Sequence, residues 1–375
     1  MAKKTVLALA MTFGLMLSAC AADWTDANNN QYSALKSIKG GGGGSTGGPR
    51  IVTDIRPAGT DTVKLKFTPA TLSGNECLFC TRNSKTGSSV QTDAFSGFRT
   101  SNKIRIDRYH TARYTTCTTT VLTINNDYAV VADFNKGNVV GSAEDSAVSI
   151  NGIYQALSPG GRTDGKLGNV NYTPAGPLML FASHFAGSEL SESSAYDNTS
   201  SCYLYYFQLY SSNGTLKHNL MPARNANGVA GLYDTVGRKF YGPVGPSGHD
   251  TFTAAARTVT GTGVKWTGLG GDNKMSTGAN WEGGVAPVAG QDLDFTLAVP
   301  LAEINADISG VTFGKMWLDD GDIPTFTGSM TISAVNLPLK IAGNPAITMT
   351  AGDYTWNGGS AANWGAAGVW MQYGV

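Results

Sequence analysis

The fold class is decided by residues 203–241, which read YLYYFQLYSSNGTLKHNLMPARNANGVAGLYDTVGRKFY. Aromatic and aliphatic residues fill Tyr203–Tyr210, and the Asn213-Gly214 dipeptide that follows favours a tight hairpin turn. The chain returns over Thr215–Met221. Leu232-Tyr233 and Lys239–Tyr241 bracket a second polar turn. This alternation of short β-rich segments and turns predicts two consecutive β-hairpins.

The same pattern extends toward the N-terminus as far as Ile51. Val63–Phe67 alternates apolar and basic residues, which is the period of a half-buried strand. The run Thr118–Ile124 is separated by three polar residues from Tyr128–Phe134, so we expect a hairpin there as well. Beyond the first 22 residues no long window shows apolar residues at helical spacing, and we expect no substantial helix. Residues 51–253 are therefore predicted to form one all-β unit, a β-sandwich.

A family resemblance lies in these segments. The stretches LYYFQLY (204–210), NLMPAR (219–224), GVAGLYD (228–234) and KFY (239–241) resemble the closing hairpins of laminin-G-like, concanavalin A-like jelly-roll domains of bacterial surface proteins. Ile51–Ile55 resembles the opening strand, and a looser resemblance begins near residue 32. Cys80 stands where that pattern usually has glycine. The resemblance implies a jelly-roll β-sandwich that binds carbohydrate or protein ligands.

The C-terminal part has a different organisation, because only Trp24 of the 7 tryptophans lies before residue 266. Trp266-Thr267-Gly268, Met275 and Ala279-Asn280-Trp281 recur as Trp356-Asn357-Gly358, Ala362-Asn363-Trp364 and Trp370, with Met275 replacing a tryptophan. Two copies of such a motif indicate an internal repeat. They resemble the tryptophan-headed β-strand repeats of autotransporter-like passenger proteins, which implies a glycine-rich, solenoid-like β-repeat region over 254–375. We expect the second repeat to be truncated.

The first 22 residues have the composition of a secretory signal peptide. Two lysines precede an apolar stretch from Val6 to Ala19, and small residues follow it. Leu17–Cys20 also matches a bacterial lipobox, which would make Cys20 the site of lipid attachment and anchor the protein to a membrane. Ordinary cleavage after Ala21 is the alternative. Residues 23–50, rich in asparagine and glycine, are expected to form a flexible segment.

Export affects the interpretation of the remaining cysteines, Cys77, Cys80, Cys117 and Cys202. An even number in an oxidising compartment is compatible with one or two disulfides, whose pairing the sequence leaves open, or with buried thiols. Cys77 and Cys80 have the spacing of a metal or redox half-site. In a regular strand, however, positions three apart point to opposite faces, so we do not expect these two thiols to converge.

The sequence lacks the usual patterns of catalytic chemistry. The closely spaced acidic residues of a jelly-roll glycosidase strand are absent, and the 4 histidines form no His-Glu-x-x-His motif. Asp319-Asp320-Gly321-Asp322 is read as an acidic turn, since calcium requires six to eight ligands. We therefore expect no catalytic residue, no metal site and no cofactor. The balance of 27 basic and 27 acidic residues also disfavours nucleic acid as a partner.

Ligand binding requires fewer residues than catalysis. By strand alternation, Tyr203, Tyr205 and Phe207 should share one face of their strand, and Tyr206 and Tyr210 the other. Ligands of the resembled domains usually bind in loops at the sandwich rim, and we predict that the contributing residues there are His184, Phe185, Tyr196, Asp197 and Asn198.

Together these features predict a non-enzymatic protein of the bacterial cell surface, used for display or adhesion, whose jelly roll contacts a surface glycan or an extracellular protein. Two alternatives remain at this point. One is a carbohydrate-active enzyme built on the same scaffold, and the other is a purely structural envelope component.

Overall fold

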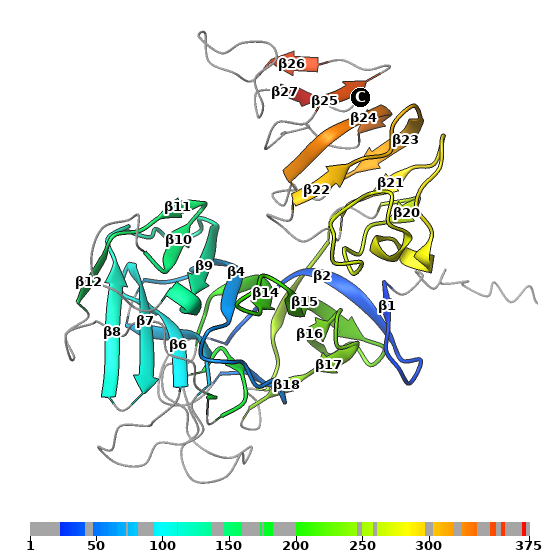
Figure 1. The fold of residues 1–375 in the computed structure, drawn as a ribbon. Helices are drawn as coiled ribbons and strands as arrows, with labels where there is room; N and C mark the ends of the chain where they lie inside the picture. Colours follow the sequence, from blue (N-terminus) through cyan, green and yellow to red (C-terminus); the bar gives the residue numbers. More distant parts are fainter. Residues whose placement is uncertain are drawn as a thin grey trace, which may run out of the picture.

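The computed structural model describes residues 23–41, 48–72, 74–81, 94–110, 112–136, 146–159, 173–174, 176–182, 200–245, 250–257, 261–296, 303–318, 325–335, 346–349, 354–356 and 370–372. These residues form a two-sheet β-sandwich followed by a smaller parallel β-sheet unit (Figure 1). The described helical segments are three 3₁₀ turns, η1 (Phe134–Lys136), η2 (Gly278–Asn280) and η3 (Glu282–Gly284). Within the described part of the chain, no helix has the length and apolar character needed to cross a membrane. The all-β prediction is confirmed.

The first sheet of the sandwich has eleven described strands, all paired antiparallel, in the order β11-β10-β9-β4-β14-β2-β15-β16-β17, with β1 and β19 also paired to β2. Their bounds are β1 (Trp24–Thr25), β2 (Gln31–Lys39), β4 (Thr62–Thr68), β9 (Tyr128–Asp133), β10 (Val148–Ile150), β11 (Ile153–Tyr154), β14 (Tyr203–Tyr210), β15 (Leu216–Asn225), β16 (Ala230–Asp234), β17 (Lys239–Tyr241) and β19 (Thr253–Ala256). The two closing hairpins predicted from the sequence are confirmed as β14–β15 and β16–β17.

The second sheet has eight described strands in the order β12-β8-β7-β6-β5-β13-β3-β18, again antiparallel. Their bounds are β3 (Arg50–Val52), β5 (Asn75–Cys80), β6 (Ala94–Thr100), β7 (Lys103–His110), β8 (Ala112–Thr118), β12 (Leu157–Pro159), β13 (Met179–Leu180) and β18 (Pro243–Val244). The predicted hairpin between Thr118–Ile124 and Tyr128–Phe134 is wrong. β8 ends at Thr118 in the second sheet, whereas β9 begins at Tyr128 in the first, so the intervening residues connect two sheets.

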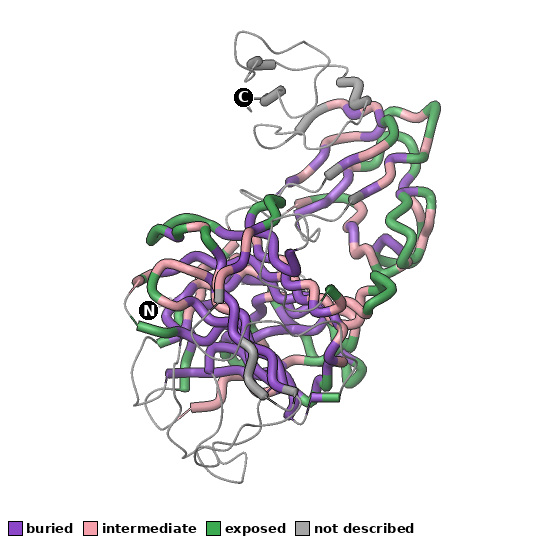
Figure 2. The backbone as a smooth tube through the Cα atoms, turned by 60° about the vertical axis from the view of Figure 1, so that its left-hand side comes forward, coloured by how far each residue is buried: buried purple, intermediate pink, exposed green. Residues whose placement is uncertain are grey.

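The core lies between the two sheets, where buried residues concentrate (Figure 2). Phe79 of β5 meets Phe207 of β14 across the core, with ring centroids 5.6 Å apart. Phe134 of η1 stacks on Phe95 of β6 at 4.3 Å. Burial of such rings from opposite sheets is the main driving force that holds a sandwich together.

The described residues 23–41 do not form the flexible segment that the composition of 23–50 predicts. β2 occupies an interior position of the first sheet and pairs with β14, β15 and β19. Leu35 and Ile38 of β2 belong to the sandwich core. Their burial outweighs the loop-like composition of the residues around them, so the folded sandwich begins before residue 51.

A β-bulge changes which aromatic residues of β14 share a face. The register with β4 shifts between Leu204 and Tyr206. Leu204 and Phe207 consequently both point into the core, and strict alternation fails. The expectation that Phe207 shares a face with Tyr203 and Tyr205 is therefore wrong.

The unit that follows the sandwich is built from parallel strands. Its six described strands have the order β20-β21-β23-β24-β22, with β25 paired to β24. Their bounds are β20 (Val264–Lys265), β21 (Leu293–Asp294), β22 (Glu303–Ala306), β23 (Thr312–Trp317), β24 (Thr325–Val335) and β25 (Ala346–Met349). β24 pairs with β22 through its first four residues and with β23 and β25 through the rest. Equivalent apolar positions therefore stack, with Ile304 beside Phe326 and Phe313 beside Ile332.

Gly328 lies where β24 changes partners. Its φ of +77° is rarely adopted by other residues, and a Cβ there would come within 2.6 Å of the Ala306 carbonyl oxygen. Glycine at this position allows β24 to pair with β22 on one side of residue 328 and with β23 and β25 on the other.

The tryptophan motif has the same pairing in both of its copies. In the first, Trp266 and Trp281 form an antiparallel bridge and their rings meet edge to face at 5.0 Å. In the second, β26 (Tyr354–Trp356) pairs antiparallel with β27 (Trp370–Gln372), placing Trp356 opposite Trp370. In each copy the first tryptophan of the motif, Trp266 or Trp356, is thus paired with the last one, Trp281 or Trp370. This agreement supports the internal repeat inferred from the spacing.

Candidate functional site

The candidate site is a cavity of about 480 Å³ between the outer face of the first sheet and the unit that contains Trp266, Trp281 and strands β20–β25. That unit is called the tryptophan unit below, and the cavity is called the junction cavity. Its sandwich wall comes from residues 23–25 and from the β15 to β17 region. Its other wall comes from residues 265–269 and 279–284. Figure 1 shows the two parts meeting here, with β1 and β2 beside the β20 region.

The sandwich wall presents a stacked pair of aromatic rings. Trp24 lies parallel to Tyr233 with ring centroids 5.4 Å apart and an interplanar angle of 8°. The Tyr233 hydroxyl donates to the Thr25 carbonyl at 3.0 Å, and Arg238 donates to the same oxygen at 3.1 Å. These bonds from the β16–β17 hairpin hold the two-residue strand β1 in place and so fix the Trp24 ring.

An Asp26-centred turn secures the other end of β1. The Asp26 carboxylate accepts hydrogen bonds from the backbone N–H groups of Asn28 and Asn30 and from the Tyr32 hydroxyl. The Asn30 side chain donates as well, at 2.9 Å, and these bonds lower the pKa of Asp26 to about 2. Asn29 adopts a φ of 63°, a conformation that asparagine tolerates. Residues 26–30, whose asparagine-rich composition predicted flexibility, therefore form an ordered turn.

Charged groups from both walls meet at the cavity. Lys265 Nζ lies 3.5 Å from Asp23 Oδ1 and 3.9 Å from Glu282 Oε2. The other Asp23 oxygen accepts the Ala34 N–H at 2.8 Å. With Arg238, the cavity thus offers two cations and two carboxylates beside an aromatic surface.

The wall from the tryptophan unit is rigid because Asn280 is fully buried and hydrogen-bonded on both sides of its amide. Its NH₂ donates to Asp272 at 2.8 Å and to the Lys274 carbonyl at 2.9 Å, while its oxygen accepts the Gly270 N–H at 2.6 Å. Trp281 Nε1 donates to the Met275 carbonyl at 2.7 Å. Met275 itself is fully buried in the core of the unit, where the repeat pattern has a tryptophan.

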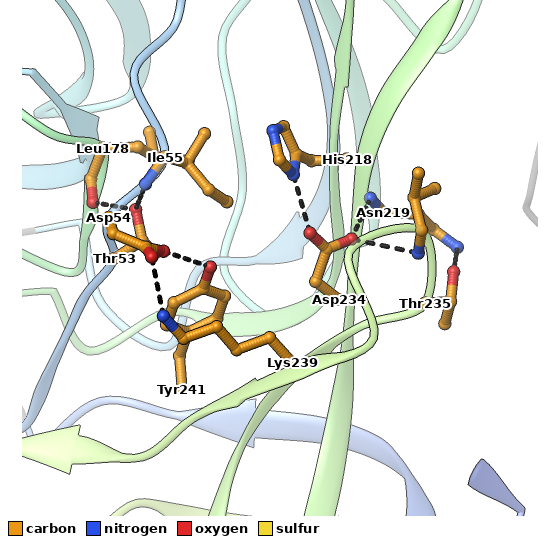
Figure 3. Close-up of polar contacts among 11 residues, drawn as sticks. Thr53, Asp54, Ile55, Leu178, His218, Asn219, Asp234, Thr235, Lys239 and Tyr241 are labelled. Carbon is orange, nitrogen blue, oxygen red and sulfur yellow. Dashed lines mark hydrogen bonds and ion pairs between the residues drawn. The ribbon is translucent and has the colours of Figure 1, made fainter. Parts of the chain in front are cut away.

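A polar network adjoins the sandwich wall (Figure 3). His218 Nδ1 lies 2.6 Å from Asp234 Oδ2, and the other Asp234 oxygen accepts the Asn219 N–H at 3.0 Å. Burial raises the pKa of Asp234, but the hydrogen bonds from His218 and the backbone outweigh it, and the pKa lies below its usual value. Asn219 Nδ2 donates to Thr235 Oγ1 at 2.9 Å, and both residues line the junction cavity.

Contacts at β17 also hold the β16–β17 hairpin in place. Lys239 Nζ and the Tyr241 hydroxyl each contact the Asp54 carboxylate at 2.6 Å, as the left half of Figure 3 shows. These contacts lower the pKa of Asp54 and fix the hairpin that carries Tyr233 and Arg238.

The predicted rim residues His184, Phe185, Tyr196, Asp197 and Asn198 lie outside the described residues, as do Cys20 and the acidic turn 319–322. The rim site and the lipid attachment therefore stay predictions. No group of three or more His, Cys, Asp or Glu side chains suited to a metal ion occurs in the part of the chain that the structure describes.

The four cysteines are thiols in this structure, of which Cys77, Cys80 and Cys202 are buried. Cys202 donates to Glu76 Oε2 at 3.3 Å, and burial first, then the Glu76 charge, raises its pKa to about 12. Cys77 donates to the Phe79 carbonyl at 3.3 Å. A register shift between Cys77 and Phe79 places Cys77 and Cys80 in one buried cluster with Phe98. The argument from strand alternation, which separated these two thiols, is therefore wrong at this bulge.

Sequence reasoning missed the residues of the junction cavity. Trp24 lies in a segment that looked unstructured, and Tyr233 and Arg238 looked like hairpin residues. The available signal was the isolated position of Trp24, the one tryptophan outside the C-terminal part. A tryptophan is costly to leave in a flexible polar segment, since its ring gains much from burial.

Comparisons with known proteins leave the family open. No protein-family model matches the chain, and no curated protein matches it. Several solved structures match part of it, and two of them are described here. A native heptameric SAP-like pentraxin from Limulus polyphemus is 14% identical with a TM-score of 0.31, covering 46% of this chain and 75% of that one. A protein of Bacteroides ovatus ATCC 8483, called a "putative carbohydrate binding protein", is 9% identical with a TM-score of 0.37, covering 60% and 61%. Similarity of this degree assigns no ligand to this chain.

Proposed function

We propose that the protein is a non-enzymatic glycan-binding protein of the bacterial cell surface and that the junction cavity is its binding site. The observation that carries the proposal is the Trp24–Tyr233 stack, which forms one wall of a cavity that also holds Asp23, Arg238, Lys265 and Glu282. A flat aromatic ring suits the apolar face of a pyranose, and nearby charged donors and acceptors suit its hydroxyl groups.

Pre-organisation supports this use of the cavity. Tyr233, Arg238 and the Asp26 turn all restrain β1, so the Trp24 ring is already positioned before a ligand arrives. A site fixed in this way loses little conformational entropy on binding.

The ion pairs at the cavity favour binding over hydrolysis. A glycosidase needs one carboxylic acid and one carboxylate facing the scissile bond. Here the Lys265 ammonium lies between Asp23 and Glu282 and contacts both. We therefore assign these carboxylates to pairing with Lys265, and of the two pairs Asp23–Lys265 connects the cavity walls.

Surface display is part of the proposal because the first 22 residues resemble a secretory signal peptide. The signal peptide would direct export, Cys20 would attach the protein to a membrane, and the C-terminal unit would act as a structural spacer. The parallel ladder of that unit supports a solenoid-like array, because parallel strands stack in successive turns. Replacing Cys20 with Ala tests the anchor. The variant should leave the membrane fraction, and continued partitioning with membranes would refute lipidation.

Binding is tested on the purified protein with an array of immobilised polysaccharides, comparing the wild type with Trp24→Ala. Losing roughly 60–100 Å² of apolar contact, at about 25 cal/mol per Å², corresponds to a loss of affinity of about tenfold or more. Tyr154→Ala is the matched control, because this half-exposed aromatic residue lies outside the residues that line the cavity. Equal binding by the wild type and Trp24→Ala would reject the site, and reproducible polysaccharide hydrolysis would reject the non-enzymatic assignment.

A further inference from the structure

A second cavity, of about 600 Å³, lies next to the junction cavity. It is called the Lys64 cavity below. The turn of the β14–β15 hairpin, Asn213–Leu216, forms one side, and the loop from Trp266 to Asn273 forms another. Lys64 of β4 and Tyr210 of β14 contribute from the outer face of the first sheet.

The two cavities adjoin along two chain segments, 266–269 and 235–236. Trp266, Thr267 and Leu269 line both of them. Thr235 lines the junction cavity, whereas its neighbour Val236 lines the Lys64 cavity. The two cavities are therefore neighbours, which is the arrangement needed to hold more than one unit of a linear chain.

Lys64 is the one formally charged side chain among the described residues that line the Lys64 cavity. Other lysines of the first sheet have carboxylate partners: Lys66 contacts Asp127 at 3.3 Å, and Lys217 contacts Asp61 at 2.7 Å. For Lys64, no carboxylate lies within ion-pair distance among the described residues. Its ammonium lies over the Tyr210 ring, 4.2 Å from the centroid.

This environment leaves the charge of Lys64 poorly compensated. Burial lowers the pKa of Lys64, because a desolvated ammonium is costly without a counter-charge. The Tyr210 hydroxyl donates to Gln208 at 3.3 Å and does not supply that charge. A cation facing an open cavity in this way is suited to an anionic group on a ligand.

We propose that the protein binds an acidic polysaccharide, with one sugar against Trp24 in the junction cavity and an anionic group of the continuing chain against Lys64. The proposal rests on the glycan-binding function proposed above. It adds the ligand's charge and the residue that recognises it. Carboxylate and sulfate groups share the required chemistry, and the probes below separate them.

The test measures affinities for polygalacturonate, dextran sulfate and neutral dextran by titration calorimetry, at two salt concentrations. Lys64→Gln should weaken binding of an acidic polymer by about tenfold, the size expected for one hydrogen bond to a charged group. Neutral dextran binding should stay unchanged. Loss for polygalacturonate alone identifies a carboxylate as the anionic group, and loss for dextran sulfate alone identifies a sulfate.

Lys315→Gln is the matched control, because Lys315 also lies over an aromatic ring, 4.4 Å from the Trp317 centroid, but lines neither cavity. It should bind every probe like the wild type. Equal losses for acidic and neutral polymers in Lys64→Gln, or no loss at all, would overturn the proposal. If the wild type binds only neutral dextran, the anionic assignment is wrong while the glycan-binding function stands. If Trp24→Ala binds every probe like the wild type while Lys64→Gln binds the acidic polymer more weakly, the binding site proposed in the junction cavity is rejected instead.

Discussion

Replacing Glu76 with Gln should destabilise the sandwich more than any surface change. Glu76 is the second residue of β5 in the second sheet, and its carboxylate reaches the residues that lead into β14 in the first. It accepts hydrogen bonds from Ser201 Oγ at 2.7 Å and from the Ser201 N–H at 3.2 Å, and it pairs with Arg99 at 2.9 Å. The Arg99 side chain has no exposed surface and that of Glu76 is 3% exposed, so this ion pair between neighbouring strands of the second sheet lies away from water. The Ser201 hydrogen bonds link the pair to the first sheet.

The expected loss of stability follows from the loss of the ion pair made by the buried Arg99 guanidinium. The Glu76→Gln substitution would keep the shape of the side chain but remove the carboxylate that pairs with the buried Arg99 guanidinium. Removing one partner of a buried pair costs about 3–5 kcal/mol, a large part of the roughly 5–15 kcal/mol that stabilises a typical domain. Replacing both residues, Glu76→Gln with Arg99→Met, should cost less than the sum of the single changes, because the second replacement removes the buried guanidinium charge.

The pH dependence gives an independent check. Burial alone would raise the pKa of Glu76, but the Ser201 and Arg99 contacts outweigh it and the pKa lies below its usual value. The contribution of Glu76 is therefore complete above the unfolded-state pKa of about 4.3 and is lost as the pH falls through the lower folded-state pKa. The stability difference between the wild type and Glu76→Gln should narrow over that acidic range.

Urea denaturation followed by tryptophan fluorescence and far-UV circular dichroism measures these differences. Two transitions are expected if the sandwich and the tryptophan unit unfold separately, and the Glu76 effect belongs to the sandwich transition. A loss below about 1 kcal/mol at pH 7, or additive costs in the double variant, would refute the buried-pair reasoning.

Three further predictions concern other parts of the molecule. Gly328→Ala should lower the stability of the tryptophan unit in urea melts by about 1–2 kcal/mol for the backbone strain, and by more because the new Cβ contacts the Ala306 carbonyl. Gly310→Ala is the control: it also has a positive φ, but its Cβ would meet no atom, so it should cost only the backbone strain. Equal losses for the two variants would contradict the role assigned to Gly328. Asn280→Ala should cost about 2–4 kcal/mol, because the buried partners of its amide lose their hydrogen bonds, and an unchanged melting curve would show that the loop does not depend on it. Iodoacetamide should label the partly exposed Cys117 before the buried Cys202 in the native protein, and mass spectrometry that finds a disulfide instead would favour the other alternative that the sequence allows.

The sequence predicted those parts of the fold where local pattern and tertiary structure agree. The β14–β15 hairpin is one such case, because the Asn213-Gly214 turn and the flanking apolar runs specify the same structure. The head and last tryptophans of the repeat also fell into equivalent positions.

The predictions that failed depend on features with weak local signals. A β-bulge inserts one residue and reverses the faces that follow, which misplaced Phe207 and separated Cys77 from Cys80. β2 became an interior strand through pairing with β14, β15 and β19, whose residues lie more than 160 positions away. The junction cavity could not be predicted for the same reason, since Trp24 and Tyr233 meet only after both pairings have formed.

The pairing of β2 with β19 determines how the molecule would carry tension. The sandwich chain enters through β2 and leaves through β19, and Ala256 at the exit lies opposite Leu35 near the entry. A pull between the N-terminal segment and the tryptophan unit would therefore act on the same end of an antiparallel pair. In that geometry the hydrogen bonds break one after another, beginning at Ala256. The rest of the sandwich would stay folded at this stage, but the junction cavity lies between the sandwich and the tryptophan unit and would open as β19 detaches.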